Sequence, residues 1–194
     1  YMALTASAKI MFEGEERTIP QLYPFMTSTD RQMRKRANEA KYDFLRANAD
    51  ELDRIFDQLV NVRARIAKKL GFSNFVELAY ARLNRTDYDA SMVANFRRQV
   101  EEHIVPVAAK LVERQRERIG IDTMKYYDLA FDFATGNPTP KGSPEWIVEN
   151  GKKMYAELSP ETDEFFTFML DNDCLDLLSK KGKATGGYCT YMSK

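Results

Sequence analysis

The chain has 194 residues, enough to bury a sizeable core in one domain, or in one large and one small domain. Charged residues make up 30% and hydrophobic residues 44%, which is typical of an ordered globular protein. The 29 basic residues balance the 29 acidic ones, so no overall field favours nucleic acid or an acidic membrane as a partner. No apolar run approaches the roughly 20 residues that span a bilayer, and the N-terminal segment lacks the pattern of a signal peptide.

The cysteine content indicates a reducing compartment. Cys174 and Cys189 are too few for a disulfide scaffold, and they lie fifteen residues apart with no CxxC motif and no matching pair of histidines. We therefore expect no zinc half-site from them, and expect Cys189 to be a small residue on a packed strand. The expected location is the cytosol.

The N-terminal stretch AKIMFEGEERTIPQL predicts a β-hairpin. The strand-forming residues Ile10-Met11-Phe12 and Thr18-Ile19 flank the turn-prone Gly14, and Pro20 is expected to end the second arm. After this hairpin the spacing of apolar residues becomes helical and stays so over most of the chain.

Start and stop signals divide the first part of the helical region. The sequence TSTD at 27–30 offers N-caps for one helix. A second helix carries apolar residues at three- and four-residue spacing from 52 to 70 and is closed by Gly71, a typical residue just after a helix. Ser73 is expected to cap a short third helix that contains Phe75 and Leu83.

A longer helix is expected over about 90–119, with Asp89 as its cap, a kink at Pro106 and its end at Gly120. Residues 124–142 interrupt the helical pattern and predict an ordered loop with at most one strand. The motif SPE then occurs twice, at 143–145 and at 159–161. Serine as N-cap, proline at the first helical position and an early acid together predict two further helices.

The C-terminal residues 188–192 are aromatic and β-branched and follow Gly186 and Gly187, so they predict the start of a β-strand. A lone strand leaves its backbone donors and acceptors unpaired. We therefore expect the strand to pair with a segment that lies beyond Lys194.

The residues taken one by one do not form a complete active site. His103 is the only histidine, so the chain alone cannot build a Ser-His-Asp triad or a two-histidine metal site, and we expect a structural or solvent-facing role for it. Two groups of acidic residues and two groups of basic residues are interpreted as solvated helix faces, without nucleic-acid binding. These groups are Asp50, Glu51, Asp53 and Asp57; Asp171, Asp173 and Asp176; Arg63, Arg65, Lys68 and Lys69; and RQRER at 114–118.

Six stretches, read in order, carry a family resemblance. They are FEGEERTIPQL (12–22), DRQMRKRANEAKYDF (30–44), ARIAKKLGFSNFVELAYARLNRTDYD (64–89), RRQVEEHIVPVAAKLVERQRERIG (97–120), GNPTPKGSPEWIVENGKKMYAELSPET (136–162) and KGKATGGYC (181–189). Together they resemble the oligoendopeptidase F branch of the M3 zinc peptidases, which are relatives of thimet oligopeptidase.

The resemblance implies a mainly α fold: the helical segment of an M3 peptidase-like fold, with a small N-terminal β-hairpin and a C-terminal β-strand. Residues 1–25 would be the hairpin lead-in, and residues 26–194 the helical part of the peptidase domain. In such enzymes two histidines of a His-Glu-x-x-His motif and a later glutamate hold zinc. The resemblance therefore places the metal ligands and catalytic residues beyond Lys194, and none of them in this chain.

The same resemblance implies that the parent protein is a zinc metalloendopeptidase acting on short peptides, with this chain inactive alone and supplying scaffold and cleft wall. Gly186, Gly187 and Tyr188 are the expected substrate-binding residues, because an extended peptide can pair with a strand edge. The alternative for the glycines is that they only turn the chain into a sheet. The alternative for the whole chain is a non-catalytic helical peptide-binding or protein-interaction module. Uncovered apolar helix faces predict self-association of the isolated chain.

Overall fold

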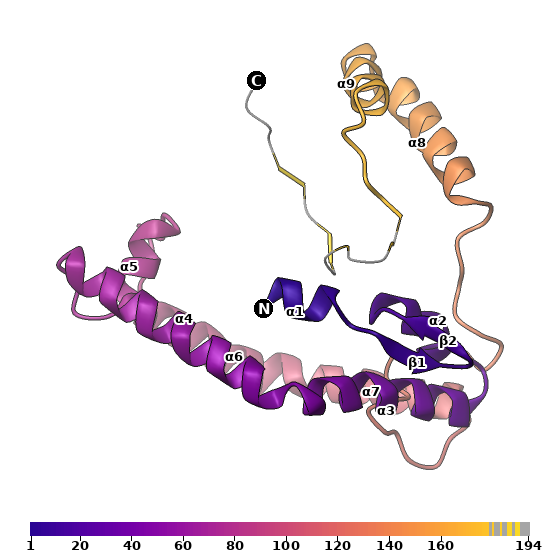
Figure 1. Cartoon of the computed structure of the whole chain (residues 1–194), viewed down its shortest axis with the longest axis horizontal. Coiled ribbons are helices and arrows are strands. Elements are labelled where there is room, and N and C mark those ends of the chain that lie inside the picture. The colour runs from indigo at the N-terminus through magenta and orange to yellow at the C-terminus, as the bar shows by residue number, and fades with distance from the viewer. Residues whose placement is uncertain (179, 181–182, 184–185, 188, 191–194) are drawn as a thin grey trace.

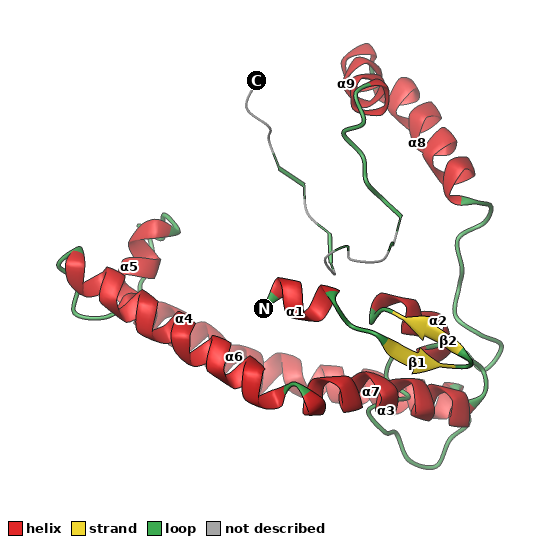
Figure 2. Cartoon of the chain, viewed as in Figure 1, coloured by secondary structure: helices red, strands yellow, loops and turns green. Residues whose placement is uncertain are grey.

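The computed structural model describes residues 1–178, 180, 183, 186–187 and 189–190, and these are mainly helical with one small sheet (Figures 1 and 2). The helices are α1 Met2–Ala6, α2 Tyr23–Met26, α3 Arg31–Ala47, α4 Ala49–Lys69, α5 Phe75–Arg82, α6 Ala90–Gln99, α7 Val105–Arg118, α8 Pro144–Leu158 and α9 Pro160–Asp171. A 3-10 turn covers Pro20–Leu22, and a π-helical turn covers Val100–Ile104. Among these helices, none is both long and apolar enough to span a membrane.

The predicted N-terminal hairpin is present, with strand β1 at Ile10–Phe12 and strand β2 at Glu15–Arg17 in antiparallel register. Glu13 and Gly14 form the turn, and both have positive φ angles, of 51° and 78°. Such a two-residue turn matches the twist of the strands and starts the second strand at once. The prediction of residues 18–19 as the second arm was wrong for this reason: β2 is the polar run just after the turn.

The apolar core lies where the hairpin packs against α2 and α3. It contains Ala8, Ile10, Phe12, Leu22 and Ala37, all buried. The rings of Phe12 and Phe25 meet edge to face with their centroids 5.1 Å apart, a favoured arrangement for aromatic pairs.

Helices α3 and α4 form one long arm, at the far end of which lies α5 (Figure 1). Asp30 caps α3 by accepting a hydrogen bond from the backbone N–H of Gln32, as the TSTD signal predicts. Gly71, with φ of 81°, follows the end of α4, as predicted. The cap of α5 was predicted one residue too early. Asn74 accepts from two backbone N–H groups, whereas the Ser73 hydroxyl donates to the Glu77 carboxylate.

The long helix predicted over 90–119 is divided into α6 and α7 by the π-helical turn. Asp89 caps α6, and Gly120, with φ of 71°, follows α7 as expected. The backbone N–H of Val105 bonds to the carbonyl of Val100, five residues earlier, so the wider turn lies directly before Pro106. Proline has no N–H for the normal ladder, which explains why the helix is irregular here.

Both SPE motifs start helices, as predicted. Ser143 caps α8 and Ser159 caps α9, each accepting from a backbone N–H three residues later. The two helices pack as a hairpin in which the rings of Tyr155 and Phe166 stack at 4.5 Å. Figure 1 places this hairpin apart from the α3–α4 arm.

Two segments of the chain are irregular. Residues 121–143 form a loop, as predicted for 124–142, and this loop contains no strand. The predicted C-terminal strand, 188–192, lies mostly outside the described residues, and Cys189 and Thr190, which are described, are not part of a strand.

Candidate functional site

The carboxylate of Asp128 is fully buried, with an exposed fraction of 0%. Asp128 belongs to the loop that follows α7. Two tight turns surround it, because its own N–H bonds to the carbonyl of Lys125 and the N–H of Phe131 bonds to the carbonyl of Asp128. A buried negative charge is costly unless it is paired and hydrogen-bonded, so its partners decide its role.

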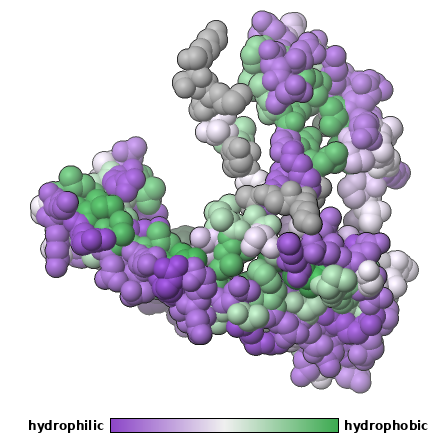
Figure 3. Space-filling model, viewed as in Figure 1, coloured by the Kyte–Doolittle hydropathy of each residue, from purple (hydrophilic) through white to green (hydrophobic). Residues whose placement is uncertain are grey.

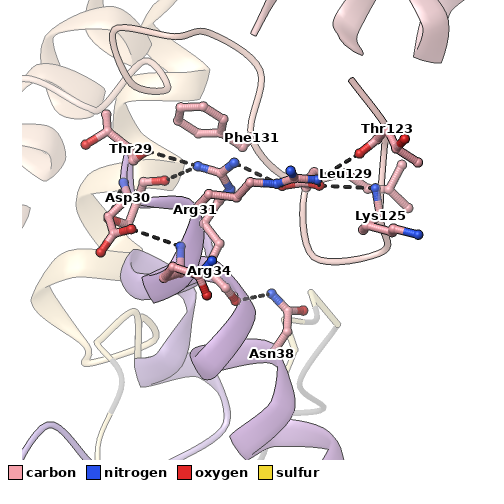
Figure 4. Close-up of polar contacts among 12 residues, drawn as sticks. Thr29, Asp30, Arg31, Arg34, Asn38, Thr123, Lys125, Leu129 and Phe131 are labelled. Atoms are coloured by element: carbon pink, nitrogen blue, oxygen red, sulfur yellow. Dashed lines mark hydrogen bonds and ion pairs between the residues drawn. The ribbon is translucent and has the colours of Figure 1, made fainter. Parts of the chain in front are cut away.

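Two arginines from the first turn of α3 supply those partners (Figure 4). Arg31 donates to both carboxylate oxygens, from Nε to Oδ1 at 3.2 Å and from Nη2 to Oδ2 at 2.8 Å. Arg34 donates from Nη2 to Oδ1 at 2.9 Å, and the backbone N–H of Lys125 donates to Oδ2 at 3.1 Å. Each oxygen therefore accepts two hydrogen bonds. We call Arg31, Arg34 and Asp128 the charged clamp.

The arginines also hold the backbone on both sides of the clamp. Arg34, itself buried, donates from Nη1 to the carbonyls of Ser28 and Thr29, and its guanidinium lies 4.1 Å from the ring centre of Phe131. Arg31 donates from Nη2 to the carbonyl of Thr123 at 2.8 Å. The clamp thus joins the start of α3 to a loop more than 90 residues later in the sequence.

The clamp is charged at neutral pH. Burial by itself would raise the pKa of Asp128, but the hydrogen bonds from Arg31, Arg34 and the Lys125 N–H outweigh it, and the pKa is lower than usual. The hydrogen bond to Asp128 in turn raises the pKa of Arg31 above its ordinary value.

The geometry of the clamp fits a structural role. Four hydrogen bonds occupy the two oxygens of Asp128, so neither oxygen has a lone pair directed toward a reacting group or a metal ion. Gln115 of α7 holds the same loop, because its Nε2 donates to the carbonyls of Leu129 and Phe131. The clamp therefore positions the loop and does not act as an acid or base.

The charged clamp was not among the sites predicted from the sequence. Its members lie 94 and 97 residues apart, and no local motif connects them. One signal was available: arginines in the first turn of a helix oppose the helix dipole, which favours acids at that end. Arg31 and Arg34 at the start of α3 therefore indicate an acidic partner elsewhere.

The candidates named from the sequence are not brought together into a catalytic site. His103 is exposed on the π-helical turn, and Cys174 and Cys189 are free thiols. Within the described residues, no three His, Cys, Asp or Glu side chains converge in a way that could hold a metal ion. A surface hollow of about 460 Å³ is lined by Arg85, Tyr88, Met92, Val93 and Phe96. This lining contains no set of side chains that could act together as acid, base and nucleophile.

The predicted substrate-binding residues are only partly described. Tyr188 lies outside the described residues. Gly186 has φ of 92°, in the left-handed region that favours glycine. Gly187 has no other residue within 4 Å of the position that a Cβ would occupy. Substrate contact by these residues stays a prediction.

The first testable prediction is that Asp128→Asn lowers the free energy of unfolding by about 3–5 kcal/mol, because it leaves the buried Arg34 without its counter-charge. Urea denaturation measures this change. The matched control is Asp43→Asn, which removes an exposed ion pair to Arg46 on α3 and should leave stability nearly unchanged. Equal effects of the two substitutions would contradict a stabilising role for the clamp.

The second prediction concerns pH. Because the pKa of Asp128 is lower in the folded chain than its unfolded value of about 3.9, the clamp stabilises fully above that value and is lost as pH falls through the folded pKa. The difference in urea midpoint between the native chain and Asp128→Asn should therefore be large at pH 7 and shrink below pH ~4. A difference that stays constant down to pH ~2 would show that the carboxylate charge is not responsible.

Comparisons with known proteins place this chain in a family. The sequence profile of peptidase family M3 matches residues 24–137. PZ peptidase A, solved with an inhibitor, is 66% identical with a TM-score of 0.94, and the match covers 98% of this chain and 34% of that one. A protein assigned as oligoendopeptidase F is 63% identical with a TM-score of 0.94, and covers 98% of this chain and 34% of its own.

An oligoendopeptidase F assigned in Bacillus anthracis strain Ames is 64% identical with a TM-score of 0.92, over 98% of this chain and 35% of that one. A search of curated proteins found no match. The chain spans about one third of the length of these solved relatives. The matches over more than half of this chain, in sequence and in structure, show that it belongs to peptidase family M3, as a segment of the oligoendopeptidase F type.

Proposed function

We propose that this chain is the helical scaffold and part of the cleft wall of a zinc-dependent oligoendopeptidase that hydrolyses short peptides. One observation carries the proposal: 98% of the chain superposes on PZ peptidase A, solved with an inhibitor, at a TM-score of 0.94 and 66% identity. The relative is about three times longer, so the proposed activity belongs to the longer protein. Within it, residues 1–25 are the hairpin lead-in and residues 26–194 the helical part of the peptidase domain.

The proposed zinc site lies outside the described residues, because among these no three His, Cys, Asp or Glu side chains come together to bind a metal ion. When bound, zinc supplies a Lewis acid for the scissile carbonyl and an activated water. The described residues contribute rigidity: the charged clamp and the caps of α3, α6, α8 and α9 hold helices and loop in one arrangement. A rigid wall keeps substrate-positioning groups in register.

The second candidate function is a non-catalytic peptide-binding or protein-interaction module. Large exposed side chains such as Phe56, Phe96 and Phe168 favour it, because exposed apolar patches mark interaction sites. The same side chains also favour self-association of the isolated chain. The cysteine usage favours the cytosol as the location. The balance of charges gives no reason to expect a nucleic-acid partner or an acidic membrane surface.

The third prediction tests the enzyme against the binding module. In a chimera, this sequence replaces the aligned segment of the B. anthracis oligoendopeptidase F, with which it shares 64% identity. We expect the chimera to hydrolyse short peptides, to lose this activity with a zinc chelator and to regain it with added zinc, as the unmodified B. anthracis protein should. The chain alone is the control and should be inactive. A folded chimera without hydrolysis, or hydrolysis that survives complete metal removal, would contradict the proposal.

The fourth prediction concerns the proposed substrate contact at the glycines. Gly187 has room for a side chain and no positive φ, so Gly187→Val should leave folding intact. In the chimera, kcat/KM should fall at least about tenfold if substrate passes close to this backbone. Gly186→Val is the contrasting variant, because its φ of 92° makes any side chain strained, and it should lower stability. An unchanged kcat/KM for Gly187→Val with a normal unfolding midpoint would remove substrate contact from the proposal.

A further inference from the structure

The chain exposes far more surface than its size requires. Its accessible surface is 14934 Å², whereas a compact monomer of 22.4 kDa exposes about 9400 Å². The excess is roughly 5500 Å². Much of the exposed area is apolar, and Figure 3 shows apolar residues gathered along the α4–α5 arm and on the α8–α9 hairpin.

The first apolar face is a stripe on α4. Phe56, Leu59, Val62 and Ile66 recur at three- and four-residue spacing, so they lie on one side of the helix. All four are exposed, and Phe56 has an exposed fraction of 68%. A stripe of this kind normally faces a core. We call Phe56, Leu59, Val62 and Ile66 the α4 face. Beside it is a shallow hollow of about 280 Å³, which is lined by Tyr1, Leu52, Asp53, Ile55, Phe56 and Leu59.

The second apolar face lies on the α8–α9 hairpin. Neither helix has a fully buried residue, although they pack against each other. Tyr155 is partly exposed but stacks on Phe166. Six further large apolar side chains are exposed: Trp146, Ile147, Met154 and Leu158 on α8, and Phe165 and Phe168 on α9. Leu158 has an exposed fraction of 73%. We call these six residues the hairpin face.

A second copy of the chain is too small an occupant for both faces. A standard protein interface buries about 800 Å² on each partner, and obligate interfaces of 2000–5000 Å² in total bury about 1000–2500 Å² on each side. The excess surface of roughly 5500 Å² exceeds both amounts. The solved relatives adopt the same arrangement, with TM-scores of 0.92 to 0.94 over 98% of this chain, within polypeptides about three times as long.

We infer that the α4 face and the hairpin face are internal interfaces, covered by the polypeptide that the oligoendopeptidase F-type proteins possess outside the aligned third. The occupant is therefore a large, apolar-faced part of the same protein, not a second copy of this chain. The inference uses the family membership on which the proposed function also rests, but it does not require peptidase activity. Charge supports the orientation on α4: the opposite side of that helix carries Lys68, which stays in water.

The fifth prediction tests the α4 face by thiol labelling in the chimera, with all other cysteines changed to serine, including Cys174 and Cys189. Leu59→Cys lies on the α4 face. Lys68→Cys lies nine residues later and so on the opposite side of the same helix, as the matched control. In the chimera, Leu59→Cys should react with a thiol reagent about 100-fold more slowly than Lys68→Cys. In the isolated chain at low concentration, the two should react at similar rates.

A second pair, Leu158→Cys and Glu149→Cys on α8, repeats the test on the hairpin face if a variant at Leu59 does not fold; Glu149 is exposed and lies nine residues before Leu158, on the opposite side of the helix. Equal reactivity within the chimera at both pairs overturns the inference. So does labelling of Leu59→Cys in the chimera that becomes slower as the concentration of the chimera rises, since this identifies a second copy as the cover. Hydrolysis is assayed on the same samples. Protected thiols in an inactive chimera would support the covered faces and reject the proposed function.

Discussion

The buried charge of Asp128 is the constraint on which the arrangement of the long loop depends. A carboxylate with no exposed surface needs opposite charge and full hydrogen bonding. Arg31 and Arg34 provide the charge and three hydrogen bonds, and the backbone N–H of Lys125 donates the fourth. Because the arginines belong to the first turn of α3, the loop after α7 must return to that point. The apolar core of the hairpin packs on the same helix, so α3 connects the two parts of the chain.

Outside this junction the chain is held mainly by local interactions. Side-chain caps start α3, α5, α6, α8 and α9, and glycines with positive φ follow α4 and α7. Such signals determine where helices begin and end, but each contributes only about 1 kcal/mol. Tertiary packing supplies most of the stability of protein helices. The apolar faces of α4, α8 and α9 have no such packing within the described residues, which is reasonable for a segment that spans a third of its relatives.

Features that depend on local interactions were predicted well from the sequence, and features that depend on neighbouring strands or distant segments were not. Asp30, Asp89, Ser143 and Ser159 were predicted as caps and are caps, because the hydrogen bond reaches only two or three residues along the chain. The cap of α5 was predicted at Ser73 but is Asn74. Either of these adjacent polar residues can cap a helix, and only the local backbone conformation selects between them. The second strand was misplaced because it is polar and its position depends on the turn at Glu13 and Gly14.

The sequence by itself determined the mainly helical fold, the hairpin, the helix boundaries to within a few residues and the family, because periodicity, caps and motifs are local properties. It could not predict the complete charged clamp, because Arg31 and Arg34 indicate an acidic partner but no local pattern identifies Asp128, which lies more than 90 positions away. It predicted that some apolar helix faces are uncovered, but not that the stripe of α4 is one of them, because a helical stripe indicates that a partner exists without identifying it. Tertiary structure alone decided these two features, since both depend on which distant segments meet.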